Sequence, residues 1–310
     1  MDVSALKVAL IGPPNAGKTS LLRVLKGEYE RLLSVAPTKL VDREMIGLLD
    51  KLFVIWDFGG QDLYRQRYVS EPSYFLDEIE YLIYVIDTTD DDKTDLAIQY
   101  FEEILQKTKE LKYPIKLAIV FNKIDPQAEN NPDLHKKANI LTEEFESKAS
   151  NYGLSPKFFR TSIFDSISVI DAFSHFFIDA SLKNYTHEIF KEIVKKFTLI
   201  YVALFSSSNV VISSASTPFK DPNSLNLLIS DIIKSDHFRS VPSNSISIQQ
   251  KEENVLIIPL KFEKQLFKLL FVSPHNISLE TEEIQNIIKE LQKNILELLG
   301  RMHITAKISF

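Results

Sequence analysis

The sequence of 310 residues contains no cysteine and no apolar run long enough to span a bilayer. The lack of cysteine excludes disulfides, thiolate catalysis and lipid attachment through sulfur, and it fits a reducing, cytoplasmic location. Asp2 excludes N-myristoylation, so we expect no intrinsic membrane anchor.

Excess positive charge is also lacking, because the formal net charge is -6. This balance argues against a surface built for nucleic acid or anionic lipid. The 45% hydrophobic and 25% charged content is typical of a soluble globular protein. At this length we expect two domains.

In residues 1–183, short apolar runs alternate with segments of helical period, which predicts an α/β fold with a largely parallel sheet. The expected strands are 6–11, 51–57, 80–87, 115–122 and 157–161. Helices are expected from Lys18, Thr94, Pro132 and Ser168.

The stretch "GPPNAGKT" at 12–19 lies between the first strand and the first helix, with the spacing of a phosphate-binding loop. Pro13 and Pro14 have no N–H group, but they come early in the loop. Lys18 would reach the β- and γ-phosphates, and the Thr19 hydroxyl would bind Mg²⁺. The expected phosphate-binding residues are Gly12, Asn15, Ala16, Gly17, Lys18, Thr19 and Ser20.

The segment "FNKID" at 121–125 favours guanine over adenine. Asp125 can accept hydrogen bonds from the guanine N1–H and its exocyclic amine, donors that adenine does not present together. Asn122 and Lys123 are further nucleotide-binding candidates, and the backbone of Ser162 and Ile163 in "RTSI" can contact the base. A P-loop ATPase or kinase is the less favoured alternative.

"IWDFGGQD" at 55–62 predicts a sensor of the γ-phosphate. Asp57 would hold Mg²⁺, through water, and the Gly60 N–H would meet the γ-phosphate. Gln61 is the expected catalytic residue, because a glutamine there can orient the attacking water. Thr38 in "VAPTKL" is a second hydroxyl ligand, so the expected metal ligands are Thr19, Thr38 and Asp57.

Arg65 and Arg67 follow Gln61 in a segment that we expect to be mobile. They can meet a partner or pair with acids, and a built-in arginine finger is the less favoured alternative.

Together these motifs resemble the Ras superfamily of small GTPases, and "WDFGGQD" with "FFRTSIFD" resembles its Rag (Gtr) branch. The Arf branch shares "WD-x-GGQ" and is the nearest alternative. The resemblance implies a GTPase domain at 1–183 with a mostly parallel six-stranded sheet. It also implies a roadblock/longin-like α+β domain at 184–310.

The second half has no catalytic or metal-binding cluster, and its predicted elements alternate between helices and pairs or triplets of strands. Helices are expected at 187–197, 222–238 and 278–300, the last ending at Gly300. Strands are expected at 198–205, 209–216, 244–250, 254–262 and 266–273. This order resembles a roadblock/longin domain, which implies a homodimer or a heterodimer with a paralogue; an appendage docked on its own GTPase domain is the alternative.

The sequence therefore predicts a switch that binds GTP or GDP with Mg²⁺ and hydrolyses GTP slowly. A scaffold that binds GTP with negligible hydrolysis, or an Arf-like GTPase, is the alternative reading. GTPase-activating and exchange proteins are candidate partners, and nucleic acid is not expected to be one.

Overall fold

The protein forms two compact units, Met1–Phe176 and Phe177–Phe310. The computed structural model describes residues 5–26, 28–48, 51–126, 131–177, 180–206, 211–217, 225, 228–229, 231–233, 235–239, 245–250, 252–263 and 265–308. Helix α7 (Ala180–Phe197) runs across the sequence-predicted boundary at 183 and 184.

The first unit contains a six-stranded sheet in the order β2-β3-β1-β4-β5-β6. The sheet is mostly parallel, as predicted, and only β2 runs antiparallel, against β3. The bounds are β1 Ala5–Ile11, β2 Val41–Leu48, β3 Lys51–Phe58, β4 Ile79–Asp87, β5 Lys116–Asn122 and β6 Lys157–Thr161.

The five strands predicted one by one from the sequence do not include β2. The first half of β2 contains the charged residues Asp42, Arg43 and Glu44, and β2 lies at the edge of the sheet, where charged side chains keep access to water. An apolar run is therefore not required for this strand.

Helices of the first unit cover both faces of the sheet. The expected crossover helices are α1 (Lys18–Leu25), α4 (Thr94–Leu111), α5 (Pro132–Ser150) and α6 (Ser166–Phe177). Two short helices, α2 (Asp62–Ser70) and α3 (Pro72–Phe75), occupy the segment that we expected to be mobile, and η1 (Tyr29–Ser34) is a 3₁₀ helix.

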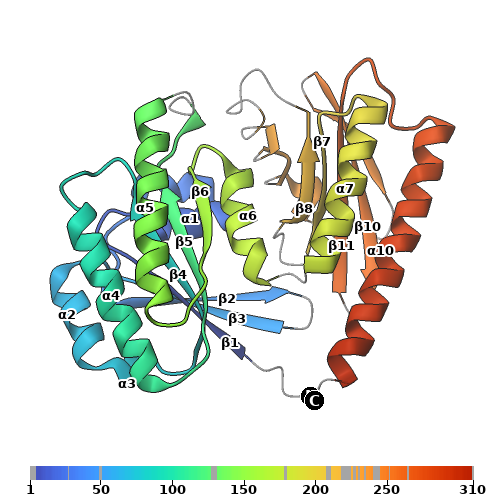
Figure 1. Ribbon diagram of the computed structural model, residues 1–310. Coiled ribbons are helices and arrows are strands. Elements are labelled where there is room, and N and C mark those ends of the chain that lie inside the picture. The colour runs from blue at the N-terminus through green and yellow to red at the C-terminus, as the bar shows by residue number, and fades with distance from the viewer. Residues whose placement is uncertain are drawn as a thin grey trace. The chain divides into compact units, whose positions relative to one another are not determined.

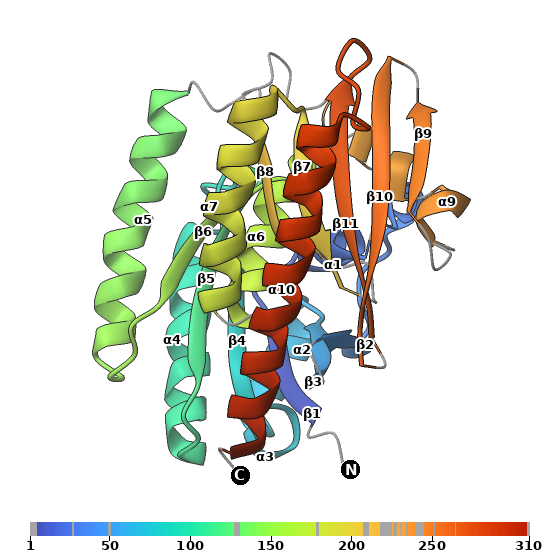
Figure 2. The same ribbon diagram turned by 90° about the vertical axis from the view of Figure 1, so that its right-hand side faces the viewer.

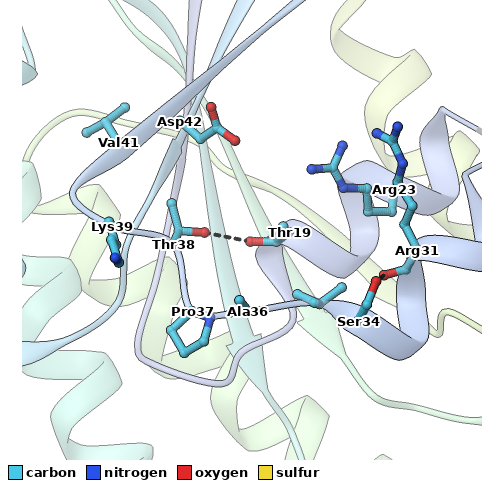
Figure 3. A pocket seen from close by; sticks show the side chains of 11 residues that line it. Thr19, Arg23, Arg31, Ser34, Ala36, Pro37, Thr38, Lys39, Val41 and Asp42 are labelled. Atoms are coloured by element: carbon cyan, nitrogen blue, oxygen red, sulfur yellow. Dashed lines mark hydrogen bonds between the residues drawn. The ribbon is translucent and has the colours of Figure 1, made fainter.

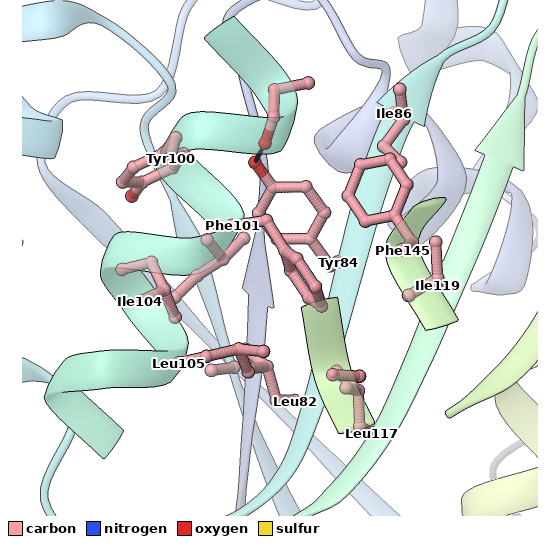
Figure 4. Close-up of a cluster of buried hydrophobic side chains, with 14 of the residues drawn as sticks. Leu82, Tyr84, Ile86, Tyr100, Phe101, Ile104, Leu105, Leu117, Ile119 and Phe145 are labelled. Atoms are coloured by element: carbon pink, nitrogen blue, oxygen red, sulfur yellow. Dashed lines mark hydrogen bonds between the residues drawn. The ribbon is translucent and has the colours of Figure 1, made fainter. Parts of the chain in front are cut away.

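One large apolar cluster lies between the sheet and helices α2 to α5, whereas α1 and α6 lie on the other side of the sheet (Figure 1). Tyr84 of β4 lies in this cluster against Phe101 and Phe145 (Figure 4). Its hydroxyl donates to the Ala97 carbonyl at 2.6 Å. The core therefore fixes the ends of β1, β3, β4 and β5, where the predicted site residues lie.

The second unit is α+β, with an antiparallel sheet in the order β8-β7-β11-β10-β9. Helices α7 and α10 (Glu282–Ile308) lie side by side on one face of it (Figure 2). Helix α9 (Asp236–Arg239) contacts β7 through the rings of Phe238 and Phe205. The strands are β7 Tyr201–Phe205, β8 Val211–Ser216, β9 Ile246–Gln250, β10 Glu253–Phe262 and β11 Gln265–Pro274.

The element order of the second unit agrees with the sequence prediction, with two differences. Helix α10 continues past Gly300: buried residues Ile295 and Leu299 keep its apolar face on the sheet up to that point, and a Cβ on Gly300 would make only a 4.0 Å contact with Phe262. Much of the helix predicted at 222–238 lies outside the described residues. Within the described part of the chain, no helix is long and apolar enough to cross a membrane.

Candidate functional site

The loop "GPPNAGKT" connects β1 to α1, and two of its positions leave no space for a side chain. A Cβ on Gly12 would lie 2.1 Å from the Val85 carbonyl oxygen. Gly17, at φ +90°, precedes α1, and a Cβ there would lie 2.3 Å from Asn122 Nδ2. Both glycines are therefore required by close approach, and Gly17 also by its backbone conformation.

Lys18 opens α1, and its buried ammonium group points back onto the loop. Its Nζ donates to the carbonyls of Gly12 at 2.8 Å and Pro13 at 2.7 Å. Burial lowers the Lys18 pKa to about 8, and the charge of Asp57 opposes this change. Pro13 thus contributes through its carbonyl, which explains how the loop accommodates a residue without an N–H.

Thr19, Thr38 and Asp57, the three metal ligands expected from the sequence, converge on one point. Both hydroxyls donate to Asp57 Oδ2, from Thr19 at 2.6 Å and from Thr38 at 3.2 Å. The two hydroxyl oxygens lie 2.9 Å apart and point toward each other (Figure 3). These oxygens come from α1, the loop before β2 and the end of β3, so the fold gathers residues that are far apart in sequence.

The second carboxylate oxygen of Asp57 supports a cation at this point. Asp57 is 1% exposed, and its Oδ1 has no hydrogen-bond partner among the described residues. Burial raises the Asp57 pKa, and hydrogen bonds from Thr19 and Thr38 act in the opposite direction. A hard cation such as Mg²⁺ prefers such oxygen ligands and would satisfy the buried oxygen. The residues present therefore fit Mg²⁺.

The metal ligands available from the protein are few. The described part of the chain contains no group of three or more His, Asp or Glu side chains that could hold a metal ion. One carboxylate and two hydroxyls leave coordination positions for phosphate oxygens and water, which is how Mg²⁺ is usually held with nucleotides.

A pocket of about 530 Å³ lies beside these hydroxyls, between α1, η1 and the loop that leads to β2 (Figure 3). Thr19 and Thr38 line one part of it, and Arg23 and Arg31 line another. Both arginines pair with Glu28, at 2.7 Å and 3.1 Å. Arg23 also pairs with Glu44, at 3.2 Å, and Lys26 pairs with both glutamates, so three cations share two carboxylates here.

The residues Gly59, Gly60 and Gln61 follow β3, and Gly60 packs close to the phosphate-binding loop. A Cβ on Gly60 would lie 2.5 Å from the Pro14 nitrogen and 2.6 Å from the Pro13 carbonyl carbon. Gln61 is exposed and precedes α2, where its carbonyl accepts from the Tyr64 and Arg65 N–H groups, both at 3.0 Å. The structure thus places Gly60 against Pro13 and Pro14, and Gln61 is the next residue in the chain.

Asn122, at the end of β5, joins two loops. Its Nδ2 donates to the Ala16 carbonyl at 2.8 Å, and its Oδ1 accepts from the Thr161 hydroxyl at 3.0 Å. Asn122 is 1% exposed, so both bonds are shielded from water. Sequence reasoning named Asn122 as a nucleotide ligand but missed Thr161, although Thr161 lies within the quoted "RTSI".

Lys123 pairs with a residue that the sequence did not single out. Its Nζ lies 2.7 Å from Asp87 Oδ2, at the end of β4. Burial by itself raises the Asp87 pKa, but the hydrogen bonds from Lys123 and Thr89 outweigh it and hold that pKa below its ordinary value. The adjacency of β4 and β5 makes this pair, and a single sequence carries no signal for it.

The base-recognition candidate Asp125 lies beside Ser162. The Ser162 hydroxyl donates to Asp125 Oδ1 at 2.6 Å, whereas its backbone N–H donates to the Ser168 hydroxyl at 3.2 Å. Ser162 thus orients the carboxylate through its side chain. Ile163 is half-buried in the turn that follows β6.

Two other predicted phosphate-binding residues lie near the start of α1. Asn15 is exposed in the phosphate-binding loop, and Ser20 lies in the first turn of the helix.

Comparison with known proteins decides the family. The conserved region of Gtr1/RagA G proteins matches residues 7–233, which is most of the chain. The chain belongs to the Gtr1/RagA family of G proteins. It is a Ras-superfamily GTPase of the Rag type, a protein that binds guanine nucleotides and hydrolyses GTP.

Relatives from two other branches of small GTPases are also similar to this chain. The Ras-related protein Rab-7B of Dictyostelium discoideum is 32% identical over 174 residues, which cover 55% of this chain and 80% of that protein. ADP-ribosylation factor-like protein 3 of Caenorhabditis elegans is 30% identical over 137 residues, 44% of this chain and 70% of that protein. The Arl6 (BBS3) small GTPase of Trypanosoma brucei, solved with the nucleotide analogue GppNp, is 18% identical with a TM-score of 0.45, over 56% of this chain and 95% of that one.

Proposed function

We propose that this Rag-type GTPase is a Mg²⁺-dependent switch whose two loops, Val35–Leu40 and Gly59–Gln61, the second of which continues into α2, respond to the γ-phosphate of GTP. The observation that carries the proposal is the convergence of Thr19 and Thr38 on Asp57 Oδ2, at 2.6 Å and 3.2 Å. Thr38 belongs to the first loop and Thr19 to the helix after the phosphate-binding loop. A ligand that binds this point therefore orders the first loop.

Each predicted residue has a defined role in the proposed mechanism. The Lys18 ammonium moves from the loop carbonyls onto the β- and γ-phosphate oxygens, and Gly60 offers its N–H to the γ-phosphate. Gln61 orients the attacking water, and Asp125 accepts hydrogen bonds from the guanine. Mg²⁺, held by Thr19, Thr38 and Asp57, would neutralise charge that develops on the phosphate oxygens.

We also propose that turnover without an activator is slow, on the order of 10⁻⁴ to 10⁻² per second, as for unstimulated small GTPases. Support comes from Pro14, whose nitrogen lies where a side chain on Gly60 would have to fit. The ring of Pro14 therefore restricts the space in which Gln61 and the attacking water must align.

Thr19→Asn tests the metal role directly. Thr19 would help to hold a metal that offsets phosphate charge, and GTP carries more of that charge than GDP. The variant should therefore lose more affinity for GTP than for GDP, and the difference should depend on Mg²⁺. Fluorescent mant-GTP and mant-GDP are titrated with Mg²⁺ and with EDTA. Thr142→Asn, on α5 with its hydroxyl on the Ala138 carbonyl, is the control. Equal losses for both nucleotides would count against the ligand role.

We further propose that the second unit mediates association with a second copy or a paralogue. Strand β9 forms one edge of the five-stranded sheet and carries isoleucine, serine and glutamine without charge. Sheet edges without charge or proline readily pair with another strand.

Sedimentation of the full chain over a range of concentrations tests this association. The exposed Ser247 of β9 is replaced by lysine, and Ser73→Lys on α3 serves as the control. Wild type and Ser73→Lys should associate as the concentration rises, while Ser247→Lys stays monomeric. A wild-type chain that stays monomeric and recovers no paralogue from its own cell would refute the proposal.

A further inference from the structure

The carbonyl of Leu40 accepts two hydrogen bonds from the segment that follows β3. The Gly59 N–H donates to it at 2.8 Å, and the Tyr68 hydroxyl of α2 donates to the same oxygen. Leu40 is in the left-handed backbone region at φ +57°, which is unfavourable for a residue with a branched side chain. Such strain persists only where surrounding contacts stabilise it, and these two donors are contacts of that kind.

Tyr68 is held in place by its ring. It is fully buried, at 0% exposed, and its ring lies 4.7 Å from that of Phe58 and 5.0 Å from that of Phe75. The hydroxyl therefore reaches Leu40 from a fixed base in the core. Burial raises the Tyr68 pKa, so this hydroxyl remains protonated, and able to donate, across the working pH range.

The Leu40 carbonyl lies between the two loops of the proposed switch. Leu40 follows Thr38 by two residues, and a Cβ on Gly59 would lie 2.5 Å from the Thr38 carbonyl oxygen. On the other side, Gly60 packs against the backbone of Pro13 and Pro14. If the first loop moved away from Gly59, the Gly59 N–H and the Tyr68 hydroxyl would lose the Leu40 carbonyl as their acceptor.

We propose that Tyr68 is a positioning residue that couples the two loops through its hydrogen bond to the Leu40 carbonyl. When Thr38 binds at the metal point, the Leu40 carbonyl is positioned to accept hydrogen bonds from the Gly59 N–H and the Tyr68 hydroxyl. These bonds in turn position Gly60 and Gln61. The inference rests on the proposed GTP-dependent switch and adds one residue to it, a residue that touches neither nucleotide nor metal ligand.

Tyr68→Phe tests this coupling because it removes only the hydroxyl and keeps the ring in its aromatic packing. Tyr84→Phe is a closely matched control. Tyr84 is also 0% exposed, and its hydroxyl also donates to a backbone carbonyl, that of Ala97 at 2.6 Å (Figure 4). That bond joins β4 to α4 and involves neither loop. A loss of folding stability alone should therefore be similar in the two variants.

The readouts are dissociation of mant-GTP and mant-GDP, single-turnover GTP hydrolysis and thermal unfolding. A neutral hydrogen bond is worth enough to change a rate about two- to tenfold. Tyr68→Phe should speed GTP dissociation and slow hydrolysis by about that factor, with GDP dissociation changed less. In Tyr84→Phe the ratio of GTP to GDP dissociation rates should equal that of wild type.

A second measurement keeps the test decisive whatever the size of the rate effects. Amide hydrogen exchange at Gly59 in the presence of a non-hydrolysable GTP analogue should be faster in Tyr68→Phe than in Tyr84→Phe. Equal changes in GTP and GDP dissociation, or exchange at Gly59 that matches the control, would make the hydroxyl a purely structural group and overturn the inference.

The same experiment distinguishes failure of the coupling from failure of the proposed switch. A wild-type chain whose GTP dissociation does not respond to Mg²⁺ refutes the switch itself. A wild type that responds to Mg²⁺, with a Tyr68→Phe variant that behaves like the control, refutes only the role of Tyr68.

Discussion

Asn122 Nδ2 donates to the Ala16 carbonyl across 2.8 Å, joining the end of β5 to the phosphate-binding loop. The two residues are 106 positions apart in the chain. The same side chain also accepts from the Thr161 hydroxyl, so one amide ties three segments together. The loop at 12–19 and the end of β5, where we propose that the phosphates and the base bind, are thereby fixed relative to each other.

Asn122→Ala should therefore weaken GTP and GDP binding to a similar extent, because both nucleotides need the base and β-phosphate sites in register. The change leaves a buried carbonyl and a buried hydroxyl without their partner, which costs about 1–3 kcal/mol of unfolding free energy. Denaturant unfolding and mant-nucleotide titration measure the two effects. Asn139→Ala, an exposed residue bonded to Arg160, is the control and should change neither.

Asp125→Asn should shift base preference from guanine toward xanthine. In the proposed site the carboxylate would accept hydrogen bonds from two guanine donors, whereas an amide could donate to the additional carbonyl of xanthine. Competition of GTP and XTP against mant-GDP measures the preference. In Ser162→Ala the carboxylate loses its 2.6 Å hydroxyl contact but keeps its charge, so guanine should remain preferred. An Asp125→Asn variant that prefers GTP over XTP as strongly as the wild type would exclude Asp125 as the residue that recognises the base.

The motifs on the loops could be predicted from the sequence, because each depends on residues that are close together in the chain. "GPPNAGKT", "WDFGGQD" and "FNKID" each follow a buried strand, and parallel strands bring their carboxyl ends to one edge of the sheet. The convergence of Thr19 and Asp57 follows from that rule.

The contacts between distant segments could not be predicted in the same way. The Lys123–Asp87 pair and the Tyr68–Leu40 hydrogen bond join segments whose proximity appears only once α2 and the sheet are placed. Helix α2 escaped prediction for a physical reason: its sequence DLYRQRYVS has only Arg65 and Tyr68 buried, so it has no apolar period of its own.

Nucleotide affinity should fall as the pH rises above about 8. The buried Lys18 has a pKa of about 8 in the free protein, and phosphate binding requires its protonated form. Affinity for mant-GDP should therefore decrease between pH 7 and 9, by at most about tenfold per pH unit above the pKa. Lys18→Arg stays protonated throughout and should change less, even if it binds more weakly. An equal fall in both proteins would assign the effect to the nucleotide rather than to Lys18.

Stability has the opposite pH dependence and is a less specific measurement. Because the folded pKa lies below the ordinary value of 10.5, the unfolded chain binds more protons between about pH 8 and 10.5. The free energy of unfolding of the nucleotide-free protein therefore rises over that interval. Lys7, half-buried with its pKa also lowered to about 8, contributes in the same direction. Binding thus isolates Lys18, whereas unfolding does not.

Pro14→Gly should leave nucleotide affinity nearly unchanged and alter hydrolysis. Pro14 has no N–H to lose, and the Lys18 ammonium rests on the carbonyls of Gly12 and Pro13 rather than on Pro14. The Pro14 nitrogen does lie where a Cβ on Gly60 would come within 2.5 Å, so the ring borders the segment that carries Gln61.

Glycine at position 14 removes that ring and frees φ, which gives Gln61 and the attacking water more room and the loop more freedom. Mant-GTP titration and single-turnover hydrolysis are compared in both proteins. Gly300→Ala, in α10, where the added Cβ would lie 4.0 Å from the Phe262 ring, is a control that should change neither. The prediction would be wrong if Pro14→Gly bound nucleotide much more weakly but hydrolysed the bound GTP at the wild-type rate. Pro14 would then stabilise the phosphate-binding loop and have no effect on hydrolysis.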